Sequence, residues 1–234
     1  MLSIRQRFQQ SVAIIGATLL FSQTVVAAGL MVPKGGNLPA LDIKQHHVNV
    51  VIEDGYAITT VDQVFYNPHN NELEAKYSFP VPDKASVGEF TYWIDGKPVT
   101  GEVLEKKQAR NIYEQQKAQG KQTALTEKDE YRTFDSSVYP VLPQQDVKIR
   151  LVYIQTTYAD HGIGNYVYPL EEGGVDEEKL AFWSYNQTVT EAFSFNMKLR
   201  SSYPINGVRL PQHPQAAATS ISNKEWNISL VNGQ

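Results

Sequence analysis

The sequence predicts a mainly β protein: an antiparallel β-sandwich-like domain with one amphipathic helix inserted at about residues 102–119. Three observations support this fold class. Apolar and polar residues alternate with a period of two in several segments, as in strands that bury one face. Two of these segments are followed by an Asp-Gly pair, which is typical of tight hairpin turns. Only one stretch has the 3.6-residue period of a helix.

Four strands are predicted before the helix. The first contains Val48, Val50 and Ile52, and after the turn at Asp54-Gly55 the second returns over residues 57–66. A fourth strand over residues 90–94 meets a second turn at Asp95-Gly96. The third strand places Leu73, Ala75, Tyr77 and Phe79 on one face and ends at Pro80 and Pro82, because proline has no N–H to donate to a neighbouring strand.

The helix is predicted from apolar spacing and from its end signals. Ala109, Ile112, Tyr113 and Gln116 fall at positions i, i+3, i+4 and i+7, which gives one narrow apolar stripe. Gly120 is placed to end the helix. The basic residues around it are interspersed with acidic ones, so we interpret them as a solvated face rather than a phosphate-binding patch.

Strands resume after the helix. Alternation predicts one strand from Val147 to Tyr153 and another over residues 166–170. An acidic connection then leads to further alternating runs, one with Phe193, Phe195, Met197 and Leu199 and one with Trp226, Ile228 and Leu230. The last run ends at Asn232-Gly233, a strong hairpin signal with no return strand after it, which favours a truncated chain over a frayed terminus.

Residues 1–28 have the features of a secretory signal peptide. Arg5 and Arg7 precede an uncharged apolar stretch, and Val26-Ala27-Ala28 supplies the small residues of a cleavage site. A permanent transmembrane anchor is the weaker interpretation, because the apolar run is short for a bilayer core of roughly 30 Å. We therefore expect export to the periplasm, the cell surface or the extracellular space, and no transmembrane segment after cleavage.

Composition excludes several classes of protein. The 234-residue chain has no Cys, so disulfide scaffolds and thiolate chemistry are excluded, and an exported protein without disulfides suits a bacterial envelope. A formal net charge of -4 argues against a nucleic-acid partner, which normally requires a basic face. Apolar residues make up 41% of the chain, which is enough for a sizeable core.

A catalytic or metal centre is not predicted. The chain has no Gly-x-Ser-x-Gly, Gly-x-Gly-x-x-Gly or His-Glu-x-x-His motif. His46 and His47 are adjacent, so on a strand their rings point to opposite faces and cannot share one metal. The acidic run over residues 171–178 lacks the spacing of a calcium loop and is better explained as a solvated linker. We expect no enzyme activity and no cofactor.

Aromatic residues, 11% of the chain, raise the alternative of a carbohydrate-binding module of the cell surface. Tyr92 and Trp93 are neighbours on a predicted strand, so only one of them can be displayed. For most tyrosines a place in the core with the hydroxyl at its rim is the better interpretation. A hydrolase has almost no support in the sequence.

The chain from about residue 41 to residue 170 resembles the VIT domain, the vault protein inter-alpha-trypsin module. The resemblance rests on an ordered series of motifs: Val64-Phe65-Tyr66-Asn67-Pro68, Glu74 to Pro82, Glu105 to Arg110, Tyr113-Glu114, Gly120, Phe134, Pro143 and Val147 to Tyr153. It implies structural roles for Asn67, Tyr77, Phe79, Pro80, Ala109, Tyr113 and Gly120. Among these, Phe79-Pro80 would end a buried strand, Ala109 and Tyr113 would dock the helix, and Gly120 would end it.

The family implies a partner as well as a fold. In bacterial members a VIT domain usually precedes a von Willebrand factor A domain, whose Asp-x-Ser-x-Ser motif holds a divalent ion for adhesion. Asp135-Ser136-Ser137-Val138-Tyr139 is the nearest candidate here, but Tyr139 replaces the second Ser and the segment lies inside the VIT resemblance. The resemblance therefore implies an exported, non-enzymatic interaction module that supports adhesion or protein contact at the cell envelope and is normally coupled to a von Willebrand factor A domain, which is absent here.

These inferences predict five segments. They are a signal peptide over residues 1–28, an extended leader over 29–40, a VIT domain over 41–170, an acidic linker over 171–190 and a β-rich segment over 191–234, apparently truncated. The sequence does not predict the oligomeric state.

Overall fold

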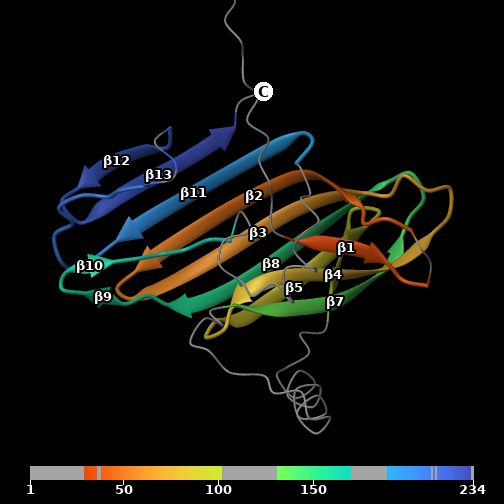
Figure 1. Cartoon of the computed structure of the whole chain (residues 1–234), viewed down its shortest axis with the longest axis horizontal. Helices are drawn as coiled ribbons and strands as arrows, with labels where there is room; N and C mark the ends of the chain where they lie inside the picture. Colours follow the sequence, from red (N-terminus) through yellow and green to blue (C-terminus); the bar gives the residue numbers. More distant parts are fainter. Residues whose placement is uncertain are drawn as a thin grey trace, which may run out of the picture.

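The computed structural model describes residues 29–35, 38–101, 131–169, 189–211, 213 and 215–232. These residues form strands and connecting turns, with no helix among them (Figure 1). The strands are β1 (Leu30–Pro33), β2 (Asp42–Glu53), β3 (Tyr56–Tyr66), β4 (Leu73–Pro82), β5 (Ser86–Ile94), β6 (Lys97–Thr100), β7 (Tyr131–Val141), β8 (Asp146–Thr156), β9 (Ala159–Asp160), β10 (Ile163–Gly164), β11 (Ala192–Arg200), β12 (Ala217–Ser222) and β13 (Glu225–Asn232). The prediction of a mainly β protein is confirmed, whereas the predicted signal peptide and the helix at about 102–119 lie outside the described residues.

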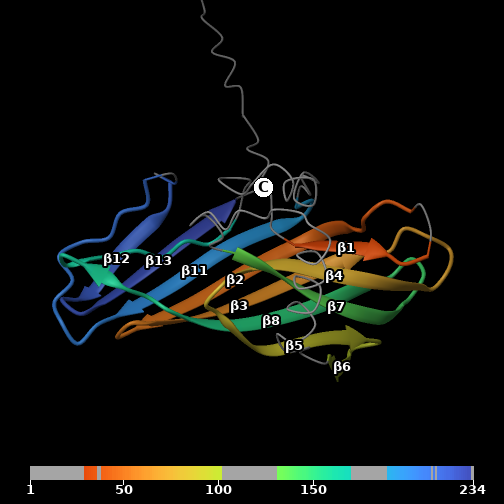
Figure 2. The ribbon, with the colours of Figure 1, turned by 60° about the horizontal axis from the view of Figure 1, so that its bottom comes forward.

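The larger sheet has eight strands in the order β12-β13-β11-β2-β3-β8-β5-β6. Neighbouring strands are antiparallel except β11 and β2, which pair in parallel from Ala192 opposite Gln45 to Arg200 opposite Glu53. Strand β12 lies at one edge and β6 at the other, as Figures 1 and 2 show together. The β-rich segment after residue 191 thus extends the same sheet that the first half of the chain begins.

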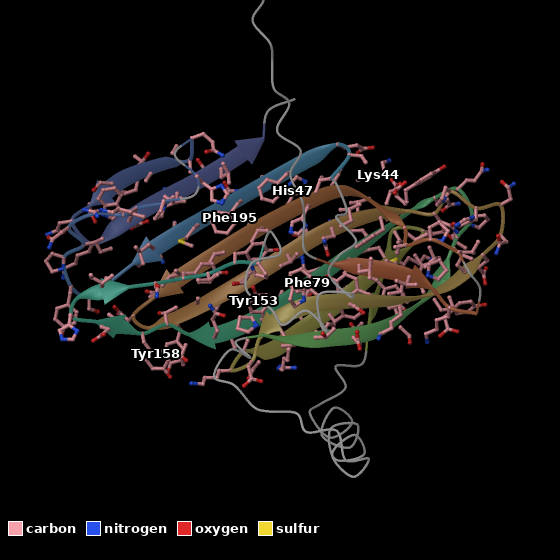
Figure 3. The ribbon with its side chains drawn as sticks, in the orientation of Figure 1. Lys44, His47, Phe79, Tyr153, Tyr158 and Phe195 are labelled. Atoms are coloured by element: carbon pink, nitrogen blue, oxygen red, sulfur yellow. The ribbon has the colours of Figure 1, made fainter. Side chains whose placement is uncertain are left out.

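The smaller sheet, β1-β4-β7, packs against the β3-β8-β5 part of the larger sheet. Apolar side chains from both sheets form the main core between them, among them Phe65, Phe79, Phe90 and Tyr153. The rings of Phe79 on β4 and Tyr153 on β8 have centroids 6.5 Å apart, and both belong to this core; Figure 3 labels the two residues. This is the face-to-face packing of a β-sandwich, and the main core is built from its alternate inward residues.

A second, smaller core covers the β2-β11-β13 part of the larger sheet. Val48 and Val50 pack there with Phe193 and Phe195, and the tyrosines Tyr166 and Tyr168 lie over them. The predicted strand over residues 166–170 is therefore wrong for residues 166–169, which are not in a strand. The alternation that suggested a strand belongs to an irregular segment that docks alternate tyrosines on the sheet.

The two predicted Asp-Gly turns are confirmed. Asp54 and Gly55 have φ values of 40° and 93° between β2 and β3, and Asp95 and Gly96 have values of 47° and 73° between β5 and β6. Two successive residues with positive φ give the turn a twist that matches the twist of the flanking strands. Asp and Gly tolerate this conformation, so the sequence encodes both hairpins locally.

Three expectations about the remaining strands need correction. The segment expected to be an extended leader contains β1, which pairs with β4 from Leu30 opposite Ser78 to Pro33 opposite Ala75. Strand β4 continues through Pro80, because it pairs with β7 as far as Pro82. The run ending at Asn232 does not lack neighbours: β13 pairs with β11 along its whole length and with β12 over Glu225–Ser229.

Candidate interaction face

The larger sheet buries one face and exposes the other, which we call the outer face. On β2 and β3 the residues from Val48 to Ile52 and from Ala57 to Phe65 alternate between core and solvent, so every second side chain belongs to the outer face. The paired registers of β2, β3, β8 and β5 align these outward residues in rows that cross the strands. Each row is a candidate contact surface.

One row is apolar over three central strands. Val51 on β2 is paired with Ile58 on β3, which is paired with Ile154 on β8. Their side chains are 38%, 45% and 40% exposed, and Tyr56 beside them is 58% exposed. Single exposed apolar residues are normal, but a contiguous apolar patch on a soluble surface marks an interaction site more often than chance.

A second row of outward residues is charged or polar and crosses β2, β3 and β8 at His47, Asp62 and Arg150. The guanidinium of Arg150 on β8 donates to both carboxylate oxygens of Asp62 on β3, at 2.8 Å and 3.1 Å. The hydrogen bonds that Arg150 donates to Asp62 raise the pKa of Arg150 above its ordinary value. On β2, the Nδ1 of His47 lies 2.8 Å from the Oγ of Ser194 on β11. These contacts hold the outward side chains in fixed positions.

At the end of the sheet, a β-bulge brings a lysine into contact with two acidic residues. The register of β2 shifts between Ile43 and Gln45, and Lys44 lies at this irregularity (Figure 3). Its ammonium contacts carboxylates of Glu191 at 2.9 Å and Asp146 at 3.1 Å, and lies 5.7 Å from the centroid of the Tyr66 ring. Hydrogen bonds to Glu191 and Asp146 raise the pKa of Lys44, and the bond from Lys44 lowers the pKa of Glu191.

Tyr92 and Trp93 separate as the sequence predicts. Tyr92 is 8% exposed and its hydroxyl donates to the backbone oxygen of Tyr139 at 3.2 Å. Trp93 is on the outer face, where the Nζ of Lys148 lies 4.9 Å and the Cζ of Arg150 5.8 Å from the indole. Trp93 is therefore the displayed aromatic residue of the pair, and two cations on β8 fix its position.

A buried polar chain, which the sequence does not reveal, links the inner face to the smaller sheet. The amide Nε2 of Gln63 donates to Nδ1 of His46 at 3.1 Å, so Nε2–H of His46 donates to the Tyr168 hydroxyl at 2.8 Å. The Tyr77 hydroxyl donates to Oε1 of Gln63 at 2.8 Å. Burial, and to a lesser degree the charge of His47, lowers the pKa of His46 to about 3, so the ring is neutral. The rings of His46 and His47 lie on opposite faces, as predicted.

Four of the seven residues expected to be structural lie in the described part of the chain, and all four are buried. Tyr77 and Phe79 contact the main core, and Pro80 follows them on β4. Asn67 donates from its amide to the backbone oxygens of Val141 at 3.2 Å and Leu142 at 3.0 Å. The strand-ending role expected for Phe79-Pro80 is not observed, because β4 continues to Pro82. Ala109, Tyr113 and Gly120 lie outside the described residues.

The described part of the chain contains neither a metal-ligand cluster nor a membrane-spanning helix. No group of three or more His, Cys, Asp or Glu side chains there is placed to hold a metal ion. No helix in the same residues is long and apolar enough to cross a bilayer. The acidic run over residues 171–178 lies outside the described residues.

Comparison with known proteins identifies the domain. Residues 43–153 match the family model of the vault protein inter-alpha-trypsin domain, VIT. These residues form a VIT domain. The matched residues run from β2 through most of β8, so they include strands from both sheets that enclose the main core. The outward rows of β2, β3, β5 and β8 are surfaces of this VIT domain, and β11 to β13 extend its larger sheet beyond the matched residues.

Several curated proteins are similar to this chain. The protein mono-ADP-ribosyltransferase PARP4 of Homo sapiens is 29% identical over 80% of the chain and 11% of its own length. The von Willebrand factor A domain-containing protein 5A of Rattus norvegicus is 30% identical over 51% of the chain and 15% of its length. The inter-alpha-trypsin inhibitor heavy chain H6 of Homo sapiens is 42% identical over 30% of the chain and 5% of its length.

The chain therefore spans a small part, between 5% and 15%, of each of these relatives. A transferase activity named for a relative belongs to that whole protein, of which the matched region is about a tenth. What the VIT domain and the relatives with von Willebrand factor A domains do support is a protein-interaction module.

Proposed function

We propose that this chain is an exported, non-enzymatic interaction module whose VIT domain supports adhesion or protein contact at the cell envelope by binding a von Willebrand factor A domain. The partner is inferred from the relatives. They include von Willebrand factor A domain-containing proteins, and the chain matches only a part of each of these proteins. The partner domain belongs either to the same polypeptide or to a second protein.

The observation that carries the proposal is the apolar row of the outer face. Val51, Ile58 and Ile154 lie side by side on three central strands and are about two-fifths exposed. Lys198 on β11 is paired with Val51, so a polar border lies at one end of the row. An apolar centre with a polar rim is the usual anatomy of a protein interface.

The proposed export rests on the sequence of residues 1–28, with its arginines, short apolar run and Ala27-Ala28 site. Expression of the full chain in a bacterial host, followed by fractionation and N-terminal sequencing, tests it. We expect the exported protein to begin at Gly29. Retention of the full-length chain in the cytosol would contradict the export part of the proposal and leave the binding part standing.

Two binding experiments test the interaction. The full chain is used as bait in an extract of cell envelope, and separately titrated with a purified von Willebrand factor A domain by calorimetry. We expect a saturable contact with the purified domain in the micromolar range or tighter, about -8 kcal/mol or more favourable. Absence of contact in both experiments would refute the proposed function.

A further inference from the structure

We propose a second binding site on the outer face, an open groove that takes an uncharged pyranose oligosaccharide. The groove lies at the end of the sheet where β2 begins and where the turn after β5 projects. It is lined by two aromatic side chains, Trp93 and Tyr66, and by the amides of Gln45, Gln144 and Gln145. This ligand class is different from the protein partner proposed above, and the site is separate.

The groove is built on one row of paired residues. Gln45 on β2 is paired with Val64 on β3, Val64 with Lys148 on β8, and Lys148 with Trp93 on β5. Pro98 on β6 is paired with Trp93 and extends the row to the edge of the sheet. Val51 lies six positions after Gln45 on β2, which places the apolar row about 20 Å away along the strand.

The aromatic residues are held in place before any ligand binds. Lys148 and Arg150 lie against the Trp93 indole, and Asp62 holds Arg150 with two hydrogen bonds. Lys44 lies over the Tyr66 ring. A ring that is already fixed loses little conformational entropy on binding, so more of its contact free energy appears as affinity.

The backbone that carries Gln144 and Gln145 at the rim is also positioned by the fold. The backbone N–H of Asn67 donates to the oxygen of Gln145 at 3.0 Å, while the Asn67 side chain holds the carbonyls of Val141 and Leu142 just before it. Gln144 has a φ of 51°, and its N–H donates to the oxygen of His69 at 3.2 Å. The segment that carries both amides is thus tied to the end of β3.

The charges of the groove favour a ligand without net charge. Four charged side chains line it, Lys44 and Lys148 against Asp95 and Asp146, and their formal charges cancel. Amides donate hydrogen bonds to hydroxyl groups and accept them, carboxylates accept them, and an aromatic ring packs against the apolar face of a sugar. An open groove also encloses an inserted side chain poorly, and protein interfaces rely on enclosed aromatic or Arg anchors, so a saccharide fits better than a peptide.

The test is a titration of the full chain with chitotetraose, cellotetraose and maltotetraose, and with trigalacturonate as a charged comparator. We expect at least one neutral tetrasaccharide to bind with a Kd of about 1 mM or lower. Trp93→Ala should weaken that binding at least tenfold, and Gln145→Ala, at an exposed position, should weaken it severalfold. Tyr56→Ala, on the outer face but outside the groove, is the matched control and should leave it unchanged.

Three results would overturn this inference. They are failure of every neutral saccharide to bind at about 10 mM, unchanged binding in both Trp93→Ala and Gln145→Ala, and a clear preference for trigalacturonate. If Trp93→Ala does not fold, the saccharide affinity of Gln145→Ala still tests the proposed site. Ile58→Asp, in the apolar row, should retain saccharide binding, so loss of the saccharide site and loss of the protein site are distinguishable.

Discussion

The hydroxyl of Tyr77 on β4 donates a 2.8 Å hydrogen bond to Oε1 of Gln63 on β3, so one side chain from each sheet meets the other inside the sandwich. Both residues are fully buried. Burial raises the pKa of Tyr77 well above its ordinary value, which keeps the hydroxyl protonated and available as a donor. The bond begins the polar chain that continues through His46 to Tyr168.

Tyr77→Phe should therefore destabilise the domain. The substitution keeps the ring in the core but removes this buried hydrogen bond, whose net contribution to stability is about 0.5–1.5 kcal/mol. Urea unfolding followed by circular dichroism measures the change. Tyr203→Phe, at a tyrosine that is 79% exposed, is the matched control and should be neutral. Equal stability of the two variants would show that the bond contributes nothing.

Asn67→Ala should be at least as damaging. It removes the amide that holds the Val141 and Leu142 carbonyls, and the oxygen that accepts from the N–H of His69 at 3.0 Å. Leaving such groups unpaired in a buried corner costs about 2–4 kcal/mol. A thermal melt compared with Asn49→Ala, at an exposed asparagine on β2, measures the effect. A loss no larger than that of the control would contradict the structural role expected for Asn67.

Gly101→Ala tests the packing at the end of β6. A Cβ at this position would fall on the ring of Phe90, a fully buried core residue. Forcing the ring aside costs about 1–3 kcal/mol, as overpacking usually does. Gly88→Ala is the control, since a Cβ there meets no atom within 4 Å. Chemical unfolding of the two variants separates them, and identical midpoints would show that the Phe90 ring moves freely.

The pH dependence of stability reports on His46. Its pKa in the folded protein is about 3, below its ordinary value of 6.5, because burial disfavours the charged ring. The unfolded chain therefore binds the extra proton between these two values, so stability is fully present above pH 6.5 and is lost as pH falls toward 3. We expect unfolding free energy to fall by up to about 1.4 kcal/mol per pH unit in this window.

A variant comparison assigns that loss. Glu191 and Asp54 also have pKa values lowered in the folded state, by hydrogen bonds from Lys44 and Ser202 respectively. Their contributions fall away below their ordinary values, so pH 5 to 6.5 is the range in which His46 is the informative group. His46→Gln should flatten the slope there, whereas His161→Gln, at a histidine more than nine-tenths exposed, should not. An unchanged slope in His46→Gln would rule out the assignment.

Local features of the fold could be predicted from the sequence, and pairings distant in sequence could not. The turns at Asp54-Gly55 and Asp95-Gly96 were predictable because positive φ restricts residue type. The parallel pairing of β11 with β2 joins residues about 150 positions apart, and no local pattern encodes it. Strand β12 has no alternation to detect, because all six of its residues are exposed at the sheet edge.

The residues of the candidate site also include some that the sequence predicts and some that it does not. Neighbouring residues on a strand point to opposite faces, so the sequence predicts that only one of Tyr92 and Trp93 is exposed on the outer face. It does not predict which of the two this is. The apolar row was not predictable, since Val51, Ile58 and Ile154 come from three strands whose register is set by hydrogen bonding. Lys44 was missed because the sequence does not show the bulge at which it lies.

The most direct test of the central claim, that the outer face of the VIT domain binds a protein partner, is the affinity of Ile58→Asp for the von Willebrand factor A domain. A carboxylate in the centre of the apolar row should weaken binding at least tenfold, about 1.4 kcal/mol or more, at unchanged thermal stability. Ile163→Asp, at an isoleucine on β10 that is 75% exposed, should bind like the wild type. Wild-type affinity in Ile58→Asp would contradict the account.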